Sequence, residues 1–207
     1  MSTTTTPAPE THRSLDGVAL PPVGTYALDE SHSHVGFVAR HLVVAKTRGR
    51  FSSFRGELTI ADDPLASSVH VEIDAASVDS RDAKRDDHLR AADFFDAEHH
   101  PTITFASTAV HADGPGRFRV DGDLTVRDVT RPVVLEVELD GTVTDPWGGT
   151  RAAFTASAEV DREDFGLNWN QVLEGGGVLV GRTVRIEIEA EAVLQAATDT
   201  DAHAPAA

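Results

Sequence analysis

Two histidines near the start of the chain are the first residues whose spacing points to chemistry. His32 and His34 are separated by one residue, so on a single strand their side chains would point to the same side. Together with a carboxylate, two such imidazoles are suited to zinc, and His41 and His88 are further candidates. No third ligand follows at a recognised spacing, so hydrogen bonding at a strand entrance is the simpler interpretation. A histidine-based metalloprotein or enzyme stays open as an alternative, but we predict no metal site and no cofactor.

A segment at residues 80–97 interleaves basic and acidic side chains. Arginine matches phosphate oxygens bidentately, so Arg81, Arg85 and His88 are candidates for contact with a pyrophosphate or another polar head group. The competing interpretation is a helix tied to the fold by ion pairs with the aspartates between them. The negative net charge of the chain favours this second interpretation.

A third candidate is a run of acids. Asp161, Glu163 and Asp164 flank Arg162 and could serve as an acid–base pair on a sugar. Neighbouring acids that follow a strand are more typical of a solvated turn, which is the interpretation we favour.

Other enzyme motifs are absent from the sequence. No serine lies in a nucleophile elbow, and the glycine run at residues 175–177 lacks the preceding strand and following lysine of a phosphate-binding loop. We interpret this run as a loop that gates one end of the fold with Trp169 and Leu173. Trp147 and Trp169 are expected to be packing or rim residues.

The composition narrows the classes of partner. The chain has 207 residues, with 18 Lys and Arg against 34 Asp and Glu, a formal net charge of −16 and a pI of about 4.8. Such a charge repels the phosphates of nucleic acid and disfavours an anionic membrane surface. An acidic outer face that binds a basic protein is an alternative function.

The sequence also bears on the compartment. Cysteine is absent, which excludes disulfides and thiolate chemistry. No apolar run approaches the ~20 residues of a spanning helix, so we expect no stable membrane insertion. The first residues lack the basic and apolar regions of a signal peptide, and Arg13 lacks the neighbour of a twin-arginine signal. We therefore expect a cytoplasmic protein.

The dominant pattern that must position these residues is the alternation of apolar and polar side chains. A period of two predicts strands with one apolar and one hydrated face. The alternation is clearest at residues 69–75, 118–126, 133–140 and 184–192, and weaker at 24–28, 33–41, 48–60, 102–112 and 150–160. Turn-forming residues occur at 62–64, 113–116, 140–141 and 147–149. No βαβ rhythm is present, so an all-β antiparallel sandwich or barrel is expected.

Residues 80–97 depart from this pattern. They contain good helix formers, so we expect a helix over residues 81–91, capped by Ser80, that covers one end of a barrel. Residues 1–22 and 196–207 are expected to be disordered, because their small and polar side chains cannot offset the entropy of ordering. One domain at residues 23–195 remains.

The acids on the alternating strands mark the outer face, so the intervening apolar residues point inward. About eight strands of about ten residues, tilted by ~40°, would form a barrel roughly 25 Å tall. A barrel of this size is either just filled or holds one slender ligand, and the alternation leaves both open. Inward alanines such as Ala156 and Ala190 favour a hollow interior. The candidate lumen residues are Val35, Phe37, Leu58, Val71, Ile73, Phe105, Leu124, Val126, Leu135, Val137, Phe154, Ile186 and Ile188.

Several motifs in a fixed order support a more specific interpretation. They lie at residues 26–29, 31–37, 48–51, 81–96, 100–105, 122–127 and 161–167. In this order they resemble the YceI-like family over residues 24–194. The resemblance implies an elongated, lipocalin-like antiparallel barrel around a long isoprenoid chain. It also implies a binding protein without established catalytic activity, and a homodimer in many members.

Overall fold

The computed structural model describes residues 13–42, 44–172 and 177–196, and these are built mostly of strands. Their α-helix, α1, spans Ala83–Arg90, and 3₁₀ helices span Glu30–His32, Pro64–Ala66, Ala75–Ser77 and Arg162–Phe165. The strands are β1 (Ser14–Leu15), β2 (Val18–Ala19), β3 (Gly24–Leu28), β4 (His34–His41), β5 (Ala45–Phe51), β6 (Phe54–Ile60), β7 (Ser68–Asp74), β8 (Val78–Asp79), β9 (Thr102–Ala112), β10 (Arg117–Val126), β11 (Val129–Thr144), β12 (Thr150–Asp161) and β13 (Val180–Leu194). Leu173 and most of the predicted gating loop lie outside the described residues, as do residues 1–12 and 197–207 of the predicted tails.

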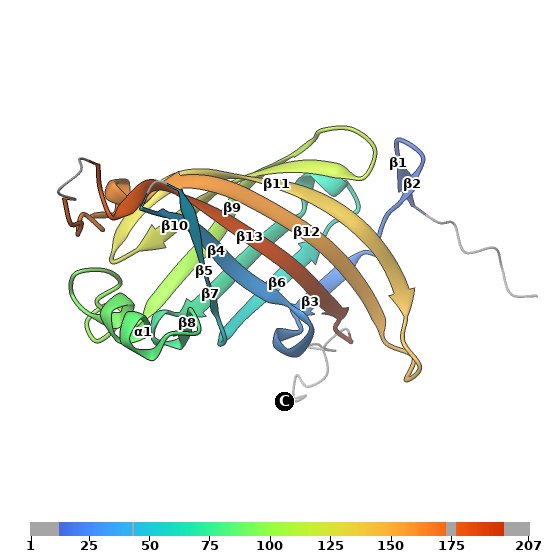
Figure 1. The fold of residues 1–207 in the computed structure, drawn as a ribbon. Coiled ribbons are helices and arrows are strands. Elements are labelled where there is room, and N and C mark those ends of the chain that lie inside the picture. Colours follow the sequence, from blue (N-terminus) through green and yellow to red (C-terminus); the bar gives the residue numbers. More distant parts are fainter. Residues whose placement is uncertain (1–12, 43, 173–176, 197–207) are drawn as a thin grey trace, which may run out of the picture.

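The strands form a closed antiparallel barrel (Figure 1). Eleven of them pair in the order β12-β11-β10-β9-β7-β6-β3-β13-β4-β5-β8, and β12 also pairs with β13, which closes the sheet. β3 and β4 lie end to end along β13, and β5/β6 and β7/β8 share the next two positions in the same way. Three split positions and five continuous strands, β9 to β13, give eight positions. The predicted barrel of about eight strands with one helical segment is confirmed.

A break in the sheet corrects one prediction. The predicted strand at residues 48–60 is interrupted at Ser52 and Ser53, between β5 and β6. Phe51 and Phe54 are both buried, although an unbroken strand would point residues three apart to opposite faces. The breaks between β3 and β4 and between β7 and β8 adjoin this one, and Ser52 N donates to the carbonyl of Ser77 at 3.1 Å.

The continuous strands are longer than predicted. β11 passes through Asp140 and Gly141, which form a bulge in the pairing with β12 rather than the predicted turn. An Asp-Gly pair is compatible with a turn and with a bulge, because glycine adopts the positive φ that both use. The φ of Gly141 is 154°. The 15 residues of β13 at ~3.3 Å each, tilted by ~40°, give a barrel roughly 40 Å tall instead of 25 Å.

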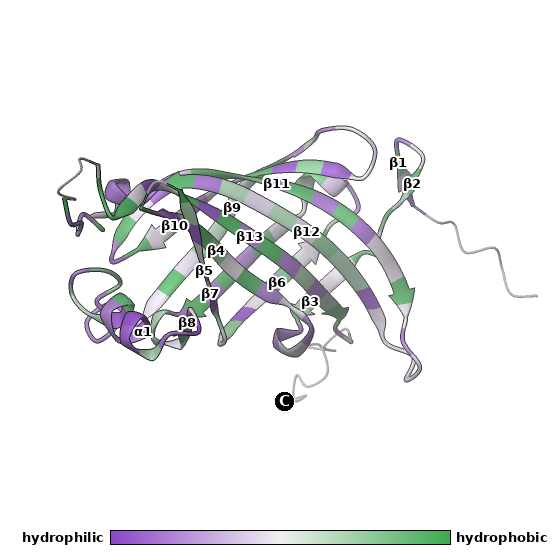
Figure 2. Ribbon diagram, in the orientation of Figure 1, coloured by the Kyte–Doolittle hydropathy of each residue, from purple (hydrophilic) through white to green (hydrophobic). Residues whose placement is uncertain are grey.

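The alternation of hydropathy follows the strands as predicted. Bands of opposite hydropathy succeed one another along β11, β12 and β13 (Figure 2). On β11, Glu136 and Glu138 are exposed whereas Leu135 is buried. The apolar side chains therefore converge inside the barrel.

Helix α1 lies at one end of the barrel, as predicted, but its cap differs. The N-cap is Asp82, whose Oδ1 accepts from Arg85 N at 3.1 Å. The predicted cap, Ser80, is buried two residues earlier, and its backbone N–H donates to the buried Asp86 carboxylate at 2.8 Å. This contact fastens the helix to the end of β8. No helix among the described residues has both the length and the apolarity to cross a bilayer.

Ordered structure begins before the predicted boundary at residue 23. β1 and β2 pair as a small hairpin, and Arg13 donates to the carbonyls of Pro21 at 3.0 Å and Ala61 at 2.6 Å. Leu20 and Pro21 then reach the interior of the barrel.

Substituting Gly49 tests how closely the inner wall is packed. Gly49 pairs with Phe37 across β4 and β5, and a Cβ at Gly49 would overlap the Phe37 ring. We expect Gly49→Ala to lower the free energy of unfolding by about 1–3 kcal/mol, because the ring must move from its position. Urea denaturation measures this change.

The double variant Phe37→Leu/Gly49→Ala is the control, because removing the ring removes the overlap. It should lose less stability than the sum of the two single variants. Additive losses would show that the ring and the glycine do not interact.

Candidate ligand-binding cavity

A cavity of about 870 Å³ lies inside the barrel. This volume is in the upper part of the range of about 300–1,000 Å³ typical of small-molecule sites. The cavity is lined by all thirteen predicted lumen residues, which are Val35, Phe37, Leu58, Val71, Ile73, Phe105, Leu124, Val126, Leu135, Val137, Phe154, Ile186 and Ile188. Of the two interiors compatible with the alternation, the structure has the hollow one.

The difference in side-chain bulk explains part of this space. Ala156 and Ala190 line the cavity from neighbouring strands, β12 and β13. The large side chains of Phe105, Phe118 and Phe154 also face it and do not meet in its middle. The inner wall is therefore apolar and uneven in depth.

Sequence reasoning missed several lining residues. Val160 and Val184 continue the alternation of β12 and β13, so their pattern could have identified them. Phe165, Leu167 and Trp169 come from the segment after β12, which has no periodicity. Only the path of the chain brings that segment to the end of the barrel.

A small core lies at one end of the barrel. Tyr26 and the inward-facing Ala152 and Ala192 are fully buried there, with Leu58 and Leu194 packed against them. The Tyr26 hydroxyl donates to the carbonyl of Pro22 at 2.9 Å, and burial raises the pKa of this phenol. This end contributes no charged side chain to the lining of the cavity.

The charged side chains that line the cavity gather at the opposite end, beside α1. Lys84 and Asp82 are exposed there, so the cavity reaches solvent. The histidine His88 packs edge-on against Phe94 and Trp169, with ring centroids 5.0 and 4.6 Å away. The charged and histidine lining residues are Arg40, His41, Asp82, Lys84, Arg85, His88 and Arg162. We call this end the mouth.

Arg162 is a buried cation at the mouth, 5% exposed. Its Nε donates to the carbonyl of Gly181 at 3.0 Å, and its Nη1 donates to the carbonyl of Leu167. Its Nη2 has no hydrogen-bond partner among the described residues, and Glu163 lies 3.9 Å away. Burial lowers the pKa of this guanidinium. Arg162 therefore ties the 3₁₀ helix at Arg162–Phe165 to the start of β13 and to the segment that follows the helix, and it adds positive charge to this end.

The three predicted head-group residues are separated by the structure. Arg81 does not line the cavity and lies instead at a shallow outer depression with Arg48 and Arg50. Arg85 lines the mouth, but its guanidinium donates to the hydroxyl and carbonyl oxygens of Ser80, both at 2.7 Å. His88 lines the mouth and lies 2.9 Å from Asp93. The prediction that Arg81 contacts a head group is therefore corrected, because Arg81 lies outside the lining of the cavity, with a backbone φ of 62°.

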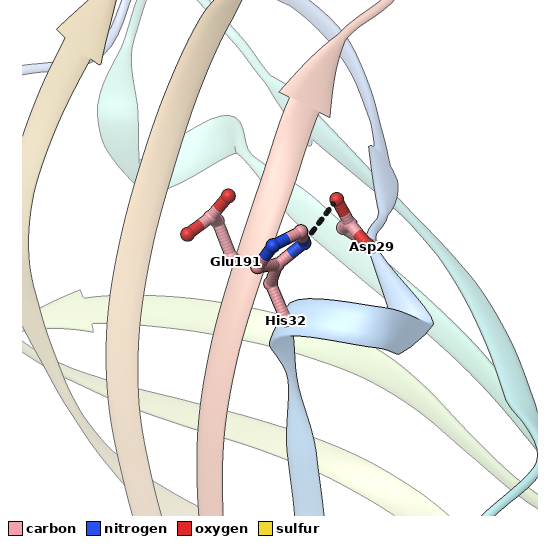
Figure 3. A group of neighbouring side chains, drawn as sticks. All are labelled: Asp29, His32 and Glu191. Atoms are coloured by element: carbon pink, nitrogen blue, oxygen red, sulfur yellow. Dashed lines mark hydrogen bonds and ion pairs between the residues drawn. The ribbon is translucent and has the colours of Figure 1, made fainter. Parts of the chain in front are cut away.

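The four candidate metal histidines do not converge. His34 and His41 lie at opposite ends of β4, and His88 is on α1. His32 lies on the 3₁₀ helix before β4, where its ligand atoms and those of Asp29 and Glu191 are within 4.8 Å of one another (Figure 3). The condition that would bring His32 and His34 to one side, a shared strand, is therefore not met, because β4 begins only at His34.

Arg151 already occupies this carboxylate cluster. Its Nη1 lies 2.8 Å from Asp29 and also contacts Glu191, and its Nε lies 2.9 Å from Asp145. Hydrogen bonds from Ser31 and Arg151 hold the pKa of Asp29 well below its usual range. A guanidinium that neutralises these acids competes with a metal ion for the same oxygens. The cluster is an ion-pair clasp between β12, β13 and the end of β3.

The acid run after β12 is also engaged in ion pairs. Arg182 contacts Asp161 at 2.8 Å and Glu163 at 3.0 Å. Asp161 caps the 3₁₀ helix by accepting from the N–H of Glu163, and Asp164 is exposed. The arrangement matches the solvated turn favoured from the sequence.

Comparison with known proteins identifies the class. The YceI-like domain matches residues 26–192, so the chain belongs to the YceI-like domain family. A UPF0312 protein of Vibrio cholerae is 42% identical over 147 residues, which cover 69% of this chain and 77% of that protein.

Two solved structures share the fold. BcnA of Burkholderia cenocepacia has a TM-score of 0.70 and 23% identity, covering 79% of this chain and 98% of that one. A polyisoprenoid binding domain from Saccharophagus degradans, implicated in plant cell wall breakdown, has a TM-score of 0.61 and 16% identity. It covers 84% of this chain and 100% of that domain.

Removing the Arg151 guanidinium tests the clasp. The pKa values of Asp29 and Asp145 are lowered in the folded state, so these groups stabilise the fold above the ordinary aspartate pKa near 4. This contribution is lost as the pH falls toward their folded pKa values. We expect Arg151→Met to melt at a lower temperature than the wild type at pH 7, with a difference that shrinks toward pH 3. Thermal unfolding followed by circular dichroism measures both.

Zinc addition separates the clasp from a metal site. The clasp predicts that zinc leaves the melting temperature of the wild type unchanged. A rise in the wild type that is absent in His32→Asn would instead assign a metal to this cluster.

Proposed function

We propose that this protein binds a polyisoprenoid or a similarly long amphiphile inside its barrel, and sequesters or carries it without catalysing a reaction. The observation that carries the proposal is the cavity of about 870 Å³ with its apolar wall. The polyisoprenoid binding domain of Saccharophagus degradans, which shares the fold, supports this class of ligand. The ion-paired state of Asp161, Glu163 and the Arg151 clasp supports a binding role over acid–base chemistry.

An apolar tail supplies the affinity in this proposal. Each CH₂ group transferred from water to the wall contributes about 0.8 kcal/mol, and ordering a flexible chain offsets part of it. A wall without hydrogen-bonding groups distinguishes ligands by width and length. Specificity for a head group must then come from the mouth.

The charges at the mouth favour an anionic head group. Lys84, Arg85 and Arg162 line this end together with one acid, Asp82. The opposite end, around Tyr26, contributes no charged side chain to the lining. A tail directed toward Tyr26 would place its head group beside Lys84, which carries no ion pair among the residues described. This orientation gives the ligand charge a partner and keeps the tail away from water.

The direct test is the content of the purified protein. We expect organic extraction followed by mass spectrometry to release a long-chain lipid, because an empty apolar cavity of this size is costly in a cell that contains lipids. The delipidated protein should then take up a fluorescent prenyl chain. An extract without lipid, together with no uptake, would contradict the proposal.

Filling the cavity should block uptake. Ala190→Trp places a large ring in the lumen, and we expect affinity for a prenyl chain to fall at least about tenfold, since two or more CH₂ groups lose their site. Fluorescence titration measures this change. The neighbouring Glu189→Trp adds the same ring on the exposed face and should bind as the wild type does. Equal affinities for the two variants would place the ligand outside the lumen.

The head-group orientation has its own test. Lys84→Gln should weaken binding of a prenyl phosphate about five- to tenfold and leave the matching prenyl alcohol unchanged, because only the phosphate uses the charge. Competition titration compares the two ligands. Equal losses for both ligands would mean that Lys84 does not contact the head group.

A further inference from the structure

The end of the barrel that carries the mouth also exposes a group of aliphatic side chains. Val44 is 85% exposed and Val172 is 79% exposed, and Leu42 and Val178 are exposed beside them. Two contacts bring these residues together: Leu42 N donates to the carbonyl of Leu179 at 2.9 Å, and Val172 bridges Val178. We call these four residues the lip. Water is a poor environment for such a group, so the lip is suited to an apolar partner.

The backbone of the lip supports a functional origin for this exposure. Leu42 has a φ of 52°, in the left-handed region that branched and bulky side chains rarely adopt. The next residues along the barrel, His41 and Val180, pair with each other and line the cavity. The exposed side chains therefore adjoin the mouth directly.

Cations without an ion pair to a described residue flank the lip on β4 and β5, Lys46 and Arg48 on the outer face and Arg40 at the rim of the cavity. Arg40 and Lys46 are exposed and lie directly opposite each other in the strand register, and Arg48 follows two residues after Lys46. None of the three forms an ion pair with a described residue, whereas the neighbouring Arg50 is paired with Asp79. Like charges at directly opposite positions destabilise a sheet, and an anionic partner would relieve this repulsion.

We propose that the lip and these three cations dock the mouth of the barrel on an anionic phospholipid bilayer. The aliphatic side chains enter the interface, and the cations contact lipid phosphates. This docking goes beyond ligand binding, since it assigns a surface through which an amphiphile could pass between bilayer and cavity without crossing water.

The net charge of −16 does not oppose such docking. Charges are screened over about 8 Å at physiological ionic strength, so a bilayer interacts mainly with the residues that face it. Several acids share this end, but Asp161 and Glu163 are paired with Arg182, and Asp93 with His88. Arg40, Lys46 and Arg48 form no ion pair with a described residue, so they supply the attraction, and docking is peripheral rather than a stable insertion.

The opposite end provides a comparison within the same molecule. The hairpin between β11 and β12 exposes Val143 and Trp147. The acid Asp145 lies beside them, and Arg151 is already paired with the acids of the clasp. Figure 1 places this hairpin at the end away from α1. This hairpin exposes apolar side chains but has no unpaired cation among the described residues, and it lies far from the mouth. Charge complementarity to an anionic bilayer therefore favours the lip as the docking surface.

Vesicle co-sedimentation tests the proposal with the full chain. We expect binding to vesicles of phosphatidylcholine mixed with phosphatidylglycerol, and little binding to phosphatidylcholine alone or in high salt. Val44→Ser/Val172→Ser and, separately, Lys46→Glu/Arg48→Glu should each weaken binding at least about tenfold. Trp147→Ser, at the opposite end, is the matched control and should bind as the wild type does.

Each outcome bears on the docking separately from ligand binding. None of the four substituted lip and cation residues lines the cavity, so uptake of a prenyl chain from solution and the melting temperature should stay unchanged in these variants. No binding of the wild type to anionic vesicles, or a loss in Trp147→Ser alone, would overturn the proposal. Such a result would leave the apolar cavity and its ligand intact.

Discussion

The structure depends on burying the inner face of one sheet that closes on itself. A sheet of this length has two edges and one apolar face, and pairing of β12 with β13 removes the edges while it turns that face inward. Closure alone does not fill the interior: the side chains of eight strand positions reach only partway to the axis, and a cavity of about 870 Å³ remains. The apolar wall stabilises the fold through the part that packs, and the part that does not pack lines the cavity proposed to bind a ligand.

The closing strands are also where the ion-pair clasp lies. Arg151 on β12 contacts Glu191 on β13 and Asp29 at the end of β3, so one guanidinium joins three neighbouring positions of the barrel. This explains why a group with the composition of a metal site serves a structural role. Arg162 has a similar structural role at the mouth. Its guanidinium donates to a carbonyl oxygen of β13 and so holds the end of β12 against the start of β13.

The two ends of the cavity differ in chemistry, which gives the barrel a direction. Around Tyr26 the wall of the cavity carries no charged side chain, whereas beside α1 it carries Lys84, Arg85 and Arg162. The exposed lip lies at this second end. Head-group recognition, passage of the ligand and contact with a bilayer are therefore all proposed at one end, and the membership of the YceI-like domain family is consistent with a barrel of this kind.

The sequence by itself determined the strands, the inward residues and the family, because a period of two assigns each side chain to a face whatever surrounds it. It also contained an unused sign of the break at Ser52, since Phe51 and Phe54 are out of phase. Only the tertiary structure decided that the interior is hollow, because periodicity carries no information about the distance between opposite walls. The same holds for Arg151 and Arg162: their partners, Glu191 and Gly181, lie farther along the chain on β13 and meet them only when β13 pairs with β12.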